Sequence, residues 1–206
     1  MLFKCMDDIL NSDILKMKFD QPVPKAGDLL LAEPLMDDIA FQRSVIILIE
    51  HSDELGSVGF VTNRCSNFTL NDLVEEIEID KEIPLYIGGP VHHDRLYFIH
   101  TLGKLIPESI EVCKGLYVSG NFNAMIEYVN SGEIIEGKVR FFLGYSGWEK
   151  KQLEKELKNS DWAVTKLRFP QRLLTLDEEE AWRTEVSELD ERYLLWLNCP
   201  SSVFLN

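Results

Sequence analysis

The chain has 206 residues, of which 45% are hydrophobic and 10% aromatic, so it contains enough apolar material to bury a core. Its 21 basic and 35 acidic residues give a net charge of −14, which argues against a general nucleic-acid binder and against a basic lipid-bound surface. The charge is uneven, because residues 1–83 carry 7 basic and 17 acidic side chains, whereas residues 150–172 carry 7 basic and 3 acidic ones. An anionic partner would therefore meet that one segment.

The first predicted element is a short amphipathic helix over residues 6–17. Its apolar residues recur at near-helical spacing: Met6, Ile9, Leu10, Ile14 and Met17. Pro22 and Pro24 then break the pattern. We interpret residues 1–22 as an N-terminal extension that packs on the domain or docks to a partner. Residues 23–206 are predicted to form a single domain.

Short β-rich runs bounded by glycine or proline predict eight strands in this domain. They are expected at residues 28–33, 44–50, 57–63, 85–87, 96–101, 109–119, 138–145 and 162–167. Four helices are expected at 69–79, 121–130, 148–159 and 175–189. Capping pairs predict three of the starts, Thr69 with Asp72, Ser146 with Glu149, and Thr175 with Glu178. Because strands and helices do not alternate regularly, the pattern favours an α+β fold with a mixed, strongly curved sheet over a doubly wound one.

The four cysteines lie far apart in the sequence, at Cys5, Cys65, Cys113 and Cys199. This spacing lacks the close pairs of zinc sites and redox motifs, so we expect reduced thiols in a cytoplasmic protein. The start of the chain has no basic stretch followed by an apolar one, and the apolar strand run 45–49 is far too short to span a membrane. We expect no metal, no cofactor and no membrane association.

Catalytic signatures are weak. The histidines at 51, 92, 93 and 100 stand at or near strand ends, without the helical spacing of a zinc-binding pair. Gly88 and Gly89 before Pro90 predict a sharp turn and are too few for a phosphate loop. Ser146 falls one residue short of a nucleophile elbow, and the predicted capping pair already uses its hydroxyl.

Several segments together resemble the AlgH-like (YqgE-like) family of bacterial proteins. They are residues 27–34, 41–46, 50–51, 59–64, 88–91 and 144–148, followed by Gln152, Leu153, Glu156 and Leu157. The resemblance covers about residues 25–170 and implies an α+β fold whose sheet curls into a pseudo-barrel flanked by helices. It also implies a cytoplasmic bacterial protein that is often labelled a transcriptional regulator. It supplies no catalytic residues.

Six residues within these motifs, five of them polar, are candidate ligand-binding residues, because they lie at strand ends or at the edge of the core. They are His51, Asn63, Arg64, Gly89, His100 and Gln152. If they converged in one pocket, a ligand site would be favoured, and if each bonded to backbone groups, a structural role would be favoured. A second candidate surface for an anion or a partner is the lysine stripe of the helix at 148–159, Lys151, Lys155 and Lys158.

These observations favour a non-enzymatic regulatory or protein-interaction domain. A protein partner is expected in preference to DNA, since the chain is acidic and shows no helix-turn-helix pairing. The alternative is a small-ligand or hydrolytic site at strand ends near His51, Asn63 and His100. The sequence leaves the oligomeric state open.

Overall fold

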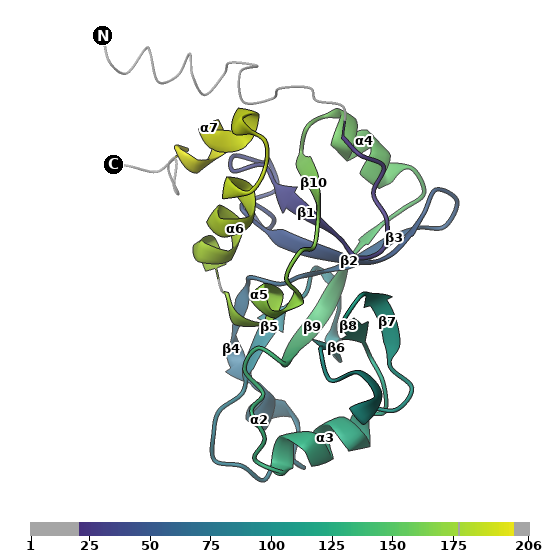
Figure 1. Cartoon of the computed structure of the whole chain (residues 1–206), viewed down its shortest axis with the longest axis vertical. Coiled ribbons are helices and arrows are strands. Elements are labelled where there is room, and N and C mark those ends of the chain that lie inside the picture. Colours follow the sequence, from purple (N-terminus) through teal and green to yellow (C-terminus); the bar gives the residue numbers. More distant parts are fainter. Residues whose placement is uncertain (1–20, 177, 200–206) are drawn as a thin grey trace.

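A computed structural model describes residues 21–176 and 178–199, and the helix expected at 6–17 lies outside them. The described chain forms a mixed α+β fold around one large sheet (Figure 1). The ten strands are β1 (Asp28–Ala32), β2 (Val45–Ser52), β3 (Gly56–Val61), β4 (Cys65–Thr69), β5 (Pro84–Ile87), β6 (Val91–His100), β7 (Ile110–Cys113), β8 (Leu116–Val118), β9 (Val139–Trp148) and β10 (Trp162–Lys166).

Six α-helices accompany the sheet in the described residues, and single 3-10 turns lie at Gly103–Leu105 and Glu191–Tyr193. The helices are α2 (Leu70–Leu73), α3 (Phe122–Asn130), α4 (Gln152–Lys158), α5 (Pro170–Thr175), α6 (Glu178–Ser187) and α7 (Leu194–Leu197). Figure 1 shows α5, α6 and α7 along one side of the sheet, α4 beyond its β10 side and α2 with α3 at the opposite end. No described helix is long and apolar enough to cross a bilayer.

The sheet follows the order β10-β1-β2-β3-β9-β6-β8-β7 and is open, with β10 and β7 at its ends. Strand β9 joins the part of the sheet that contains β3 to the part that contains β5 and β6. The first half of β9 pairs with β6 and, in parallel, with β5, while its last residues pair with β3. Gly144 lies between these halves with φ +68°, a conformation that side chains other than glycine rarely adopt. The expected mixed and curved α+β sheet is confirmed, and it does not close into a barrel.

Three apolar clusters make up the core. One packs Leu29, Ile47 and Phe142 against Trp182 and Trp196 of the C-terminal helices. A second packs β5, β6 and β9 against α2 and α3, and a third lies under α4, where Leu153 and Leu157 meet Trp148 and Trp162. Each helix is therefore held by its apolar stripe against one face of the sheet.

Seven of the eight predicted strands and the helix at 121–130 agree with the structure, in which Asn121 caps α3 by accepting a hydrogen bond from the Ala124 amide. One expected strand, 109–119, is wrong. It is a hairpin of β7 and β8, because Gly115 adopts φ +81° and turns the chain.

Three helix predictions were too long or misplaced. The Thr69–Asp72 cap is present, but α2 ends at Leu73. The side chains of Asn71 and Asn130 then bind backbone groups of the segment that follows, at Ile79 and Glu76 respectively, and hold it as a loop. Thr175 ends α5, where its hydroxyl donates to Gln171, instead of capping α6.

The predicted start of α4 was wrong for a different reason. Strand β9 continues to Trp148, since Val58 and Ser57 of β3 pair with Gly147 and Trp148. The Ser146 hydroxyl donates to the Gly88 carbonyl at 3.1 Å and caps no helix. Helix α4 begins only at Gln152, whose side-chain oxygen accepts a hydrogen bond from the Glu149 amide at 2.9 Å.

Candidate functional site

The six candidate residues do not gather in one pocket. His100 lies at the far end of β6 and is fully buried. Its Nε2 lies 3.1 Å from the Ser119 carbonyl and 3.0 Å from the Ser109 hydroxyl, and its Nδ1 accepts the Leu102 amide at 3.3 Å. Burial lowers the pKa of His100, because the charged imidazolium is poorly solvated there. These contacts make His100 a structural group at the end of the sheet.

Asn63 joins three segments of backbone at the end of β3. Its side-chain oxygen accepts the Val45 amide at 2.9 Å, and its side-chain nitrogen donates to the Arg43 carbonyl at 3.0 Å and the Glu178 carbonyl at 2.7 Å. It therefore fixes the start of β2 against the start of α6.

Arg64 and Arg43 lie beside this junction. Arg64 donates to the Gln42 carbonyl, its Nε has no hydrogen-bond partner in the described chain, and burial lowers its pKa. Arg43 pairs with Glu179 at 2.9 Å, donates to the Cys199 carbonyl at 2.7 Å and covers the Trp182 ring. The guanidinium of Arg43 thus ties β2 to the C-terminal helices.

Gly89 lies where the chain between β5 and β6 touches β9. Its φ is +150°, and a Cβ atom there would lie 2.3 Å from the Ser146 hydroxyl oxygen. The contact leaves no space for a side chain, so close backbone packing explains this glycine without a ligand.

Gln152 and Glu156 form a polar contact on α4. The Glu156 carboxylate accepts hydrogen bonds from the indole nitrogens of Trp148 at 2.7 Å and Trp162 at 2.8 Å, and from Gln152 at 2.9 Å. The carboxylate is therefore directed at the sheet, whereas Lys151, Lys155 and Lys158 are exposed. Within the described chain these three lysines form no ion pair, which leaves their stripe open to solvent.

His51 differs from the other candidates because it lines two hollows. Its Nδ1 lies 2.8 Å from the Ser57 hydroxyl, and its Nε2 lies 3.5 Å from the Asp53 carboxylate. On one side is a hollow of about 830 Å³, lined by parts of β2, β3 and β9 and by Gln152, which we call the hairpin groove. On the other side is a smaller hollow of about 350 Å³ that also includes Leu157 and Lys158.

The hairpin groove lies beside the β2–β3 hairpin, which projects next to α4 in Figure 1. Apolar side chains of the sheet face line it, namely Ile49, Val58, Val91 and Tyr145, all partly exposed. Leu55 at the tip of the hairpin is 89% exposed. Of the six candidates, His51 and Gln152 are the two that share this hollow.

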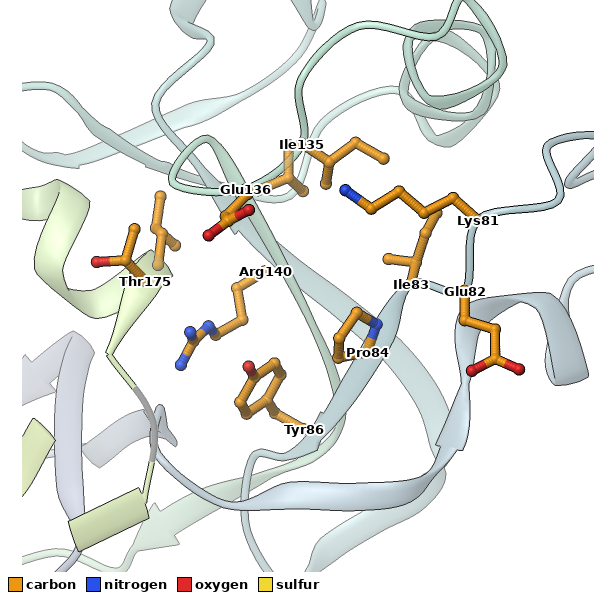
Figure 2. A pocket seen from close by; sticks show the side chains of 11 residues that line it. Lys81, Glu82, Ile83, Pro84, Tyr86, Ile135, Glu136, Arg140 and Thr175 are labelled. Carbon is orange, nitrogen blue, oxygen red and sulfur yellow. The ribbon is translucent and has the colours of Figure 1, made fainter. Parts of the chain in front are cut away.

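A third hollow, of about 260 Å³, is centred on Arg140 between β5, β9 and α5 (Figure 2). Arg140 is 4% exposed, donates to the carbonyls of Thr62 at 2.5 Å and Leu176 at 3.1 Å, and lies 3.9 Å from the Tyr86 ring centre. In Figure 2 the Glu82 side chain points away from this arginine. Arg140 thus joins the ends of β3 and α5, and the sequence analysis did not single it out.

A metal centre finds no support in the part of the chain that the structure describes, where no group of three His, Cys, Asp or Glu side chains could hold an ion. Two acidic residues at the start of α6 have structural roles. Glu179 pairs with Arg43, and Glu178 lies in the first turn of the helix.

Comparison with known proteins gives the family. The model of the AlgH-like family matches residues 29–194. The chain belongs to the AlgH-like family. The match extends past residue 170, where the resemblance in the sequence motifs was expected to end, and it includes α5 and α6. Helices α5 and α6 are thus part of the AlgH-like unit.

Named relatives are UPF0301 proteins of bacteria. The chain is 42% identical to one from Parabacteroides distasonis over 94% of this chain and 98% of that protein. It is 38% identical to one from Bacteroides fragilis over 96% of this chain and 99% of that protein. These names state no activity.

Two solved structures share the fold. The solution structure of the AlgH protein from Pseudomonas aeruginosa has a TM-score of 0.66 at 28% identity and covers 90% of this chain and 99% of that one. The crystal structure of protein DIP2367 from Corynebacterium diphtheriae has a TM-score of 0.72 at 22% identity, over 90% of this chain and 98% of that one, and shows likeness of fold alone.

Proposed function

We propose that this AlgH-like chain is a non-enzymatic regulatory domain that acts in the cytoplasm by binding another protein. The hairpin groove carries the proposal. It exposes apolar side chains of β2, β3, β6 and β9 on a concave sheet face, next to the exposed Leu55. Contiguous apolar surface of this kind marks binding sites more often than solvent-facing structure. The transcriptional-regulator label of the family fits an indirect role through such a partner.

Site-specific photo-crosslinking tests this function. Benzoylphenylalanine replaces Leu55 in the full chain, and a matched probe replaces Ile134, which is 66% exposed on the loop before β9. We expect one stoichiometric protein adduct from position 55 in bacterial cells, recovered in the cytoplasmic fraction, and none of it from position 134. Identical adduct patterns from both positions would contradict a docking role for the groove.

A second candidate function is a small-ligand or hydrolytic site at His51. It is favoured by the proximity of Ser57 and Asp53 to the two ring nitrogens of His51. The imidazole lies within hydrogen-bond reach of the hydroxyl and near the carboxylate, an arrangement that can activate a serine. Ser57 is only 5% exposed, which favours a structural hydrogen bond. Covalent labelling by a fluorophosphonate probe that Ser57→Ala abolishes, with His93→Gln as the control, would favour hydrolysis over protein binding.

A further inference from the structure

We propose that the hairpin groove binds an extended peptide segment in which apolar side chains lie next to lysine or arginine. This inference rests on the proposed protein-binding function and adds the chemistry of the partner. It follows from the apolar floor of the groove, the charge of its rim and the rigidity of its walls.

The floor selects apolar side chains. Ile49 and Tyr145 pack their inner sides against the main core cluster, yet both keep part of their surface open to the groove. Val58 and Val91 contribute further partly exposed apolar surface from neighbouring strands. An apolar side chain bound here would be removed from water on several sides. Its burial would stabilise the complex by about 25 cal/mol per Å² of buried apolar area.

The rim selects positive charge. Glu50 and Glu149 line the hairpin groove, and Asp53 and Glu154 line the smaller hollow on the other side of His51. Lys158 is the single lysine or arginine among the residues lining these two hollows. The four carboxylates outnumber Lys158 and would repel an acidic segment and attract a basic one. The other two lysines of the stripe, Lys151 and Lys155, line neither hollow.

The shape selects an extended segment over one compact side chain. The two hollows share His51 as a wall, so one ligand can run past the imidazole from β9 toward Leu157 on α4. The hairpin wall is also closely packed against β9. A Cβ atom at Gly56 would lie 2.1 Å from the Trp148 carbonyl oxygen, which shows how closely the hairpin packs on β9. A rigid groove reduces the entropy lost when a peptide binds.

Fluorescence polarisation with the full chain tests the partner chemistry. The probe is a labelled seven-residue peptide in which leucine and phenylalanine alternate with lysine. Two matched peptides carry glutamate in place of lysine, or serine in place of the apolar residues. We expect the lysine–apolar peptide to bind at least about 10-fold more tightly than either, with the preference over glutamate shrinking at high salt.

Variants locate the binding. The double variant Glu50→Gln, Glu149→Gln should weaken the lysine–apolar peptide about 3- to 10-fold at low salt, and Leu55→Ser should weaken it at all salt concentrations. All three positions are exposed, so the fold should persist, which circular dichroism checks. The control, Glu108→Gln with Glu133→Gln, removes the same charge from other exposed positions and should leave the affinity unchanged.

The outcomes separate this inference from the proposed function. If the glutamate peptide binds best and Leu55→Ser weakens it, the groove binds protein and the inferred charge preference is wrong. If the groove variants and the control act alike on every peptide, the inferred site is wrong. If in addition the probe at position 55 captures nothing specific, the proposed function fails with it.

Discussion

Asn63 shows how one side chain can join three backbone segments. Its three side-chain hydrogen bonds reach Val45, Arg43 and Glu178, so its loss would leave several buried backbone groups unpaired. We expect Asn63→Ala to lower the free energy of unfolding by about 2–4 kcal/mol. Urea denaturation measures this, with exposed Asn123→Ala as the control. A change below about 0.5 kcal/mol would contradict the structural role of Asn63.

His100 makes stability depend on pH. Burial holds its pKa below the ordinary value of 6.5, so the unfolded chain takes up a proton before the folded one does. As pH falls below about 6.5, the free energy of unfolding should therefore decrease, by at most about 1.4 kcal/mol per pH unit.

Denaturation curves between about pH 7 and pH 5 measure this loss. His100→Gln should be less stable at neutral pH and show a shallower pH dependence, whereas the exposed His93→Gln should keep the slope of the parent. Equal slopes in all three proteins would mean that His100 is not the group responsible.

Among the elements, sequence patterns predicted the strands that are continuously buried and missed elements that depend on distant contacts. The strands at 28–33, 44–50 and 162–167 are buried and β-rich, and each appears with small shifts of its ends. Strand β4 gave no such signal, because most of its residues are exposed. Helix α4 was predicted to start too early, because the pairing of Trp148 with Ser57 of β3 overrides the local capping pattern.

The candidate site was predicted less well, for a related reason. A polar residue at a strand end is expected to be partly buried and to need a hydrogen-bond partner. Its position in the sequence does not say whether that partner is a backbone group or a ligand. Asn63 and His100 bond to their own chain, and Gly89 is required by packing. Arg140 is the second residue of β9 and belongs to no recognised motif, so its contacts were visible only in the folded structure.

The contact between Gly89 and β9 is testable at the level of the element. Gly89→Ala places a methyl group where the Ser146 hydroxyl lies, at a backbone angle unfavourable for alanine. We expect a loss of at least about 3 kcal/mol of stability, or failure to fold. Gly115→Ala is the matched control, since its φ is also positive but no atom lies within 4 Å, and it should cost about 1–2 kcal/mol. Thermal unfolding compares the two, and similar losses would contradict the packing argument.

The lysine stripe of α4 bears on the regulator label. We expect no retardation of duplex DNA in a mobility-shift assay at physiological salt, because the chain as a whole carries a net charge of −14. Retardation at low salt that is lost in the triple variant Lys151→Gln, Lys155→Gln, Lys158→Gln would support direct DNA binding and overturn this expectation. A triple variant at Lys25, Lys104 and Lys114, which are also exposed, is the control.

At the scale of the whole molecule, the C-terminal helices pack against the sheet. The Trp182 indole is fully buried and donates to the Ala32 carbonyl at 2.9 Å, and Arg43 binds Glu179 beside it. The single domain predicted for residues 23–206 should therefore unfold in one transition. Calorimetry should give equal calorimetric and van't Hoff enthalpies. Trp182→Ala should lower stability by about 3–5 kcal/mol without splitting that transition, and a separate early transition would show that the helices fold apart.

The carboxylate of Glu156 has one further consequence, which is optical. It holds the indoles of Trp148 and Trp162 at once, and Trp148 also forms part of the hairpin groove. An indole with a fixed charge at its nitrogen emits at a wavelength that responds to small changes in the local field. Occupation of the groove would alter the surroundings of one of these two chromophores and leave those of Trp182 intact. The protein thus carries its own unlabelled fluorescent reporter beside the surface where a partner is expected.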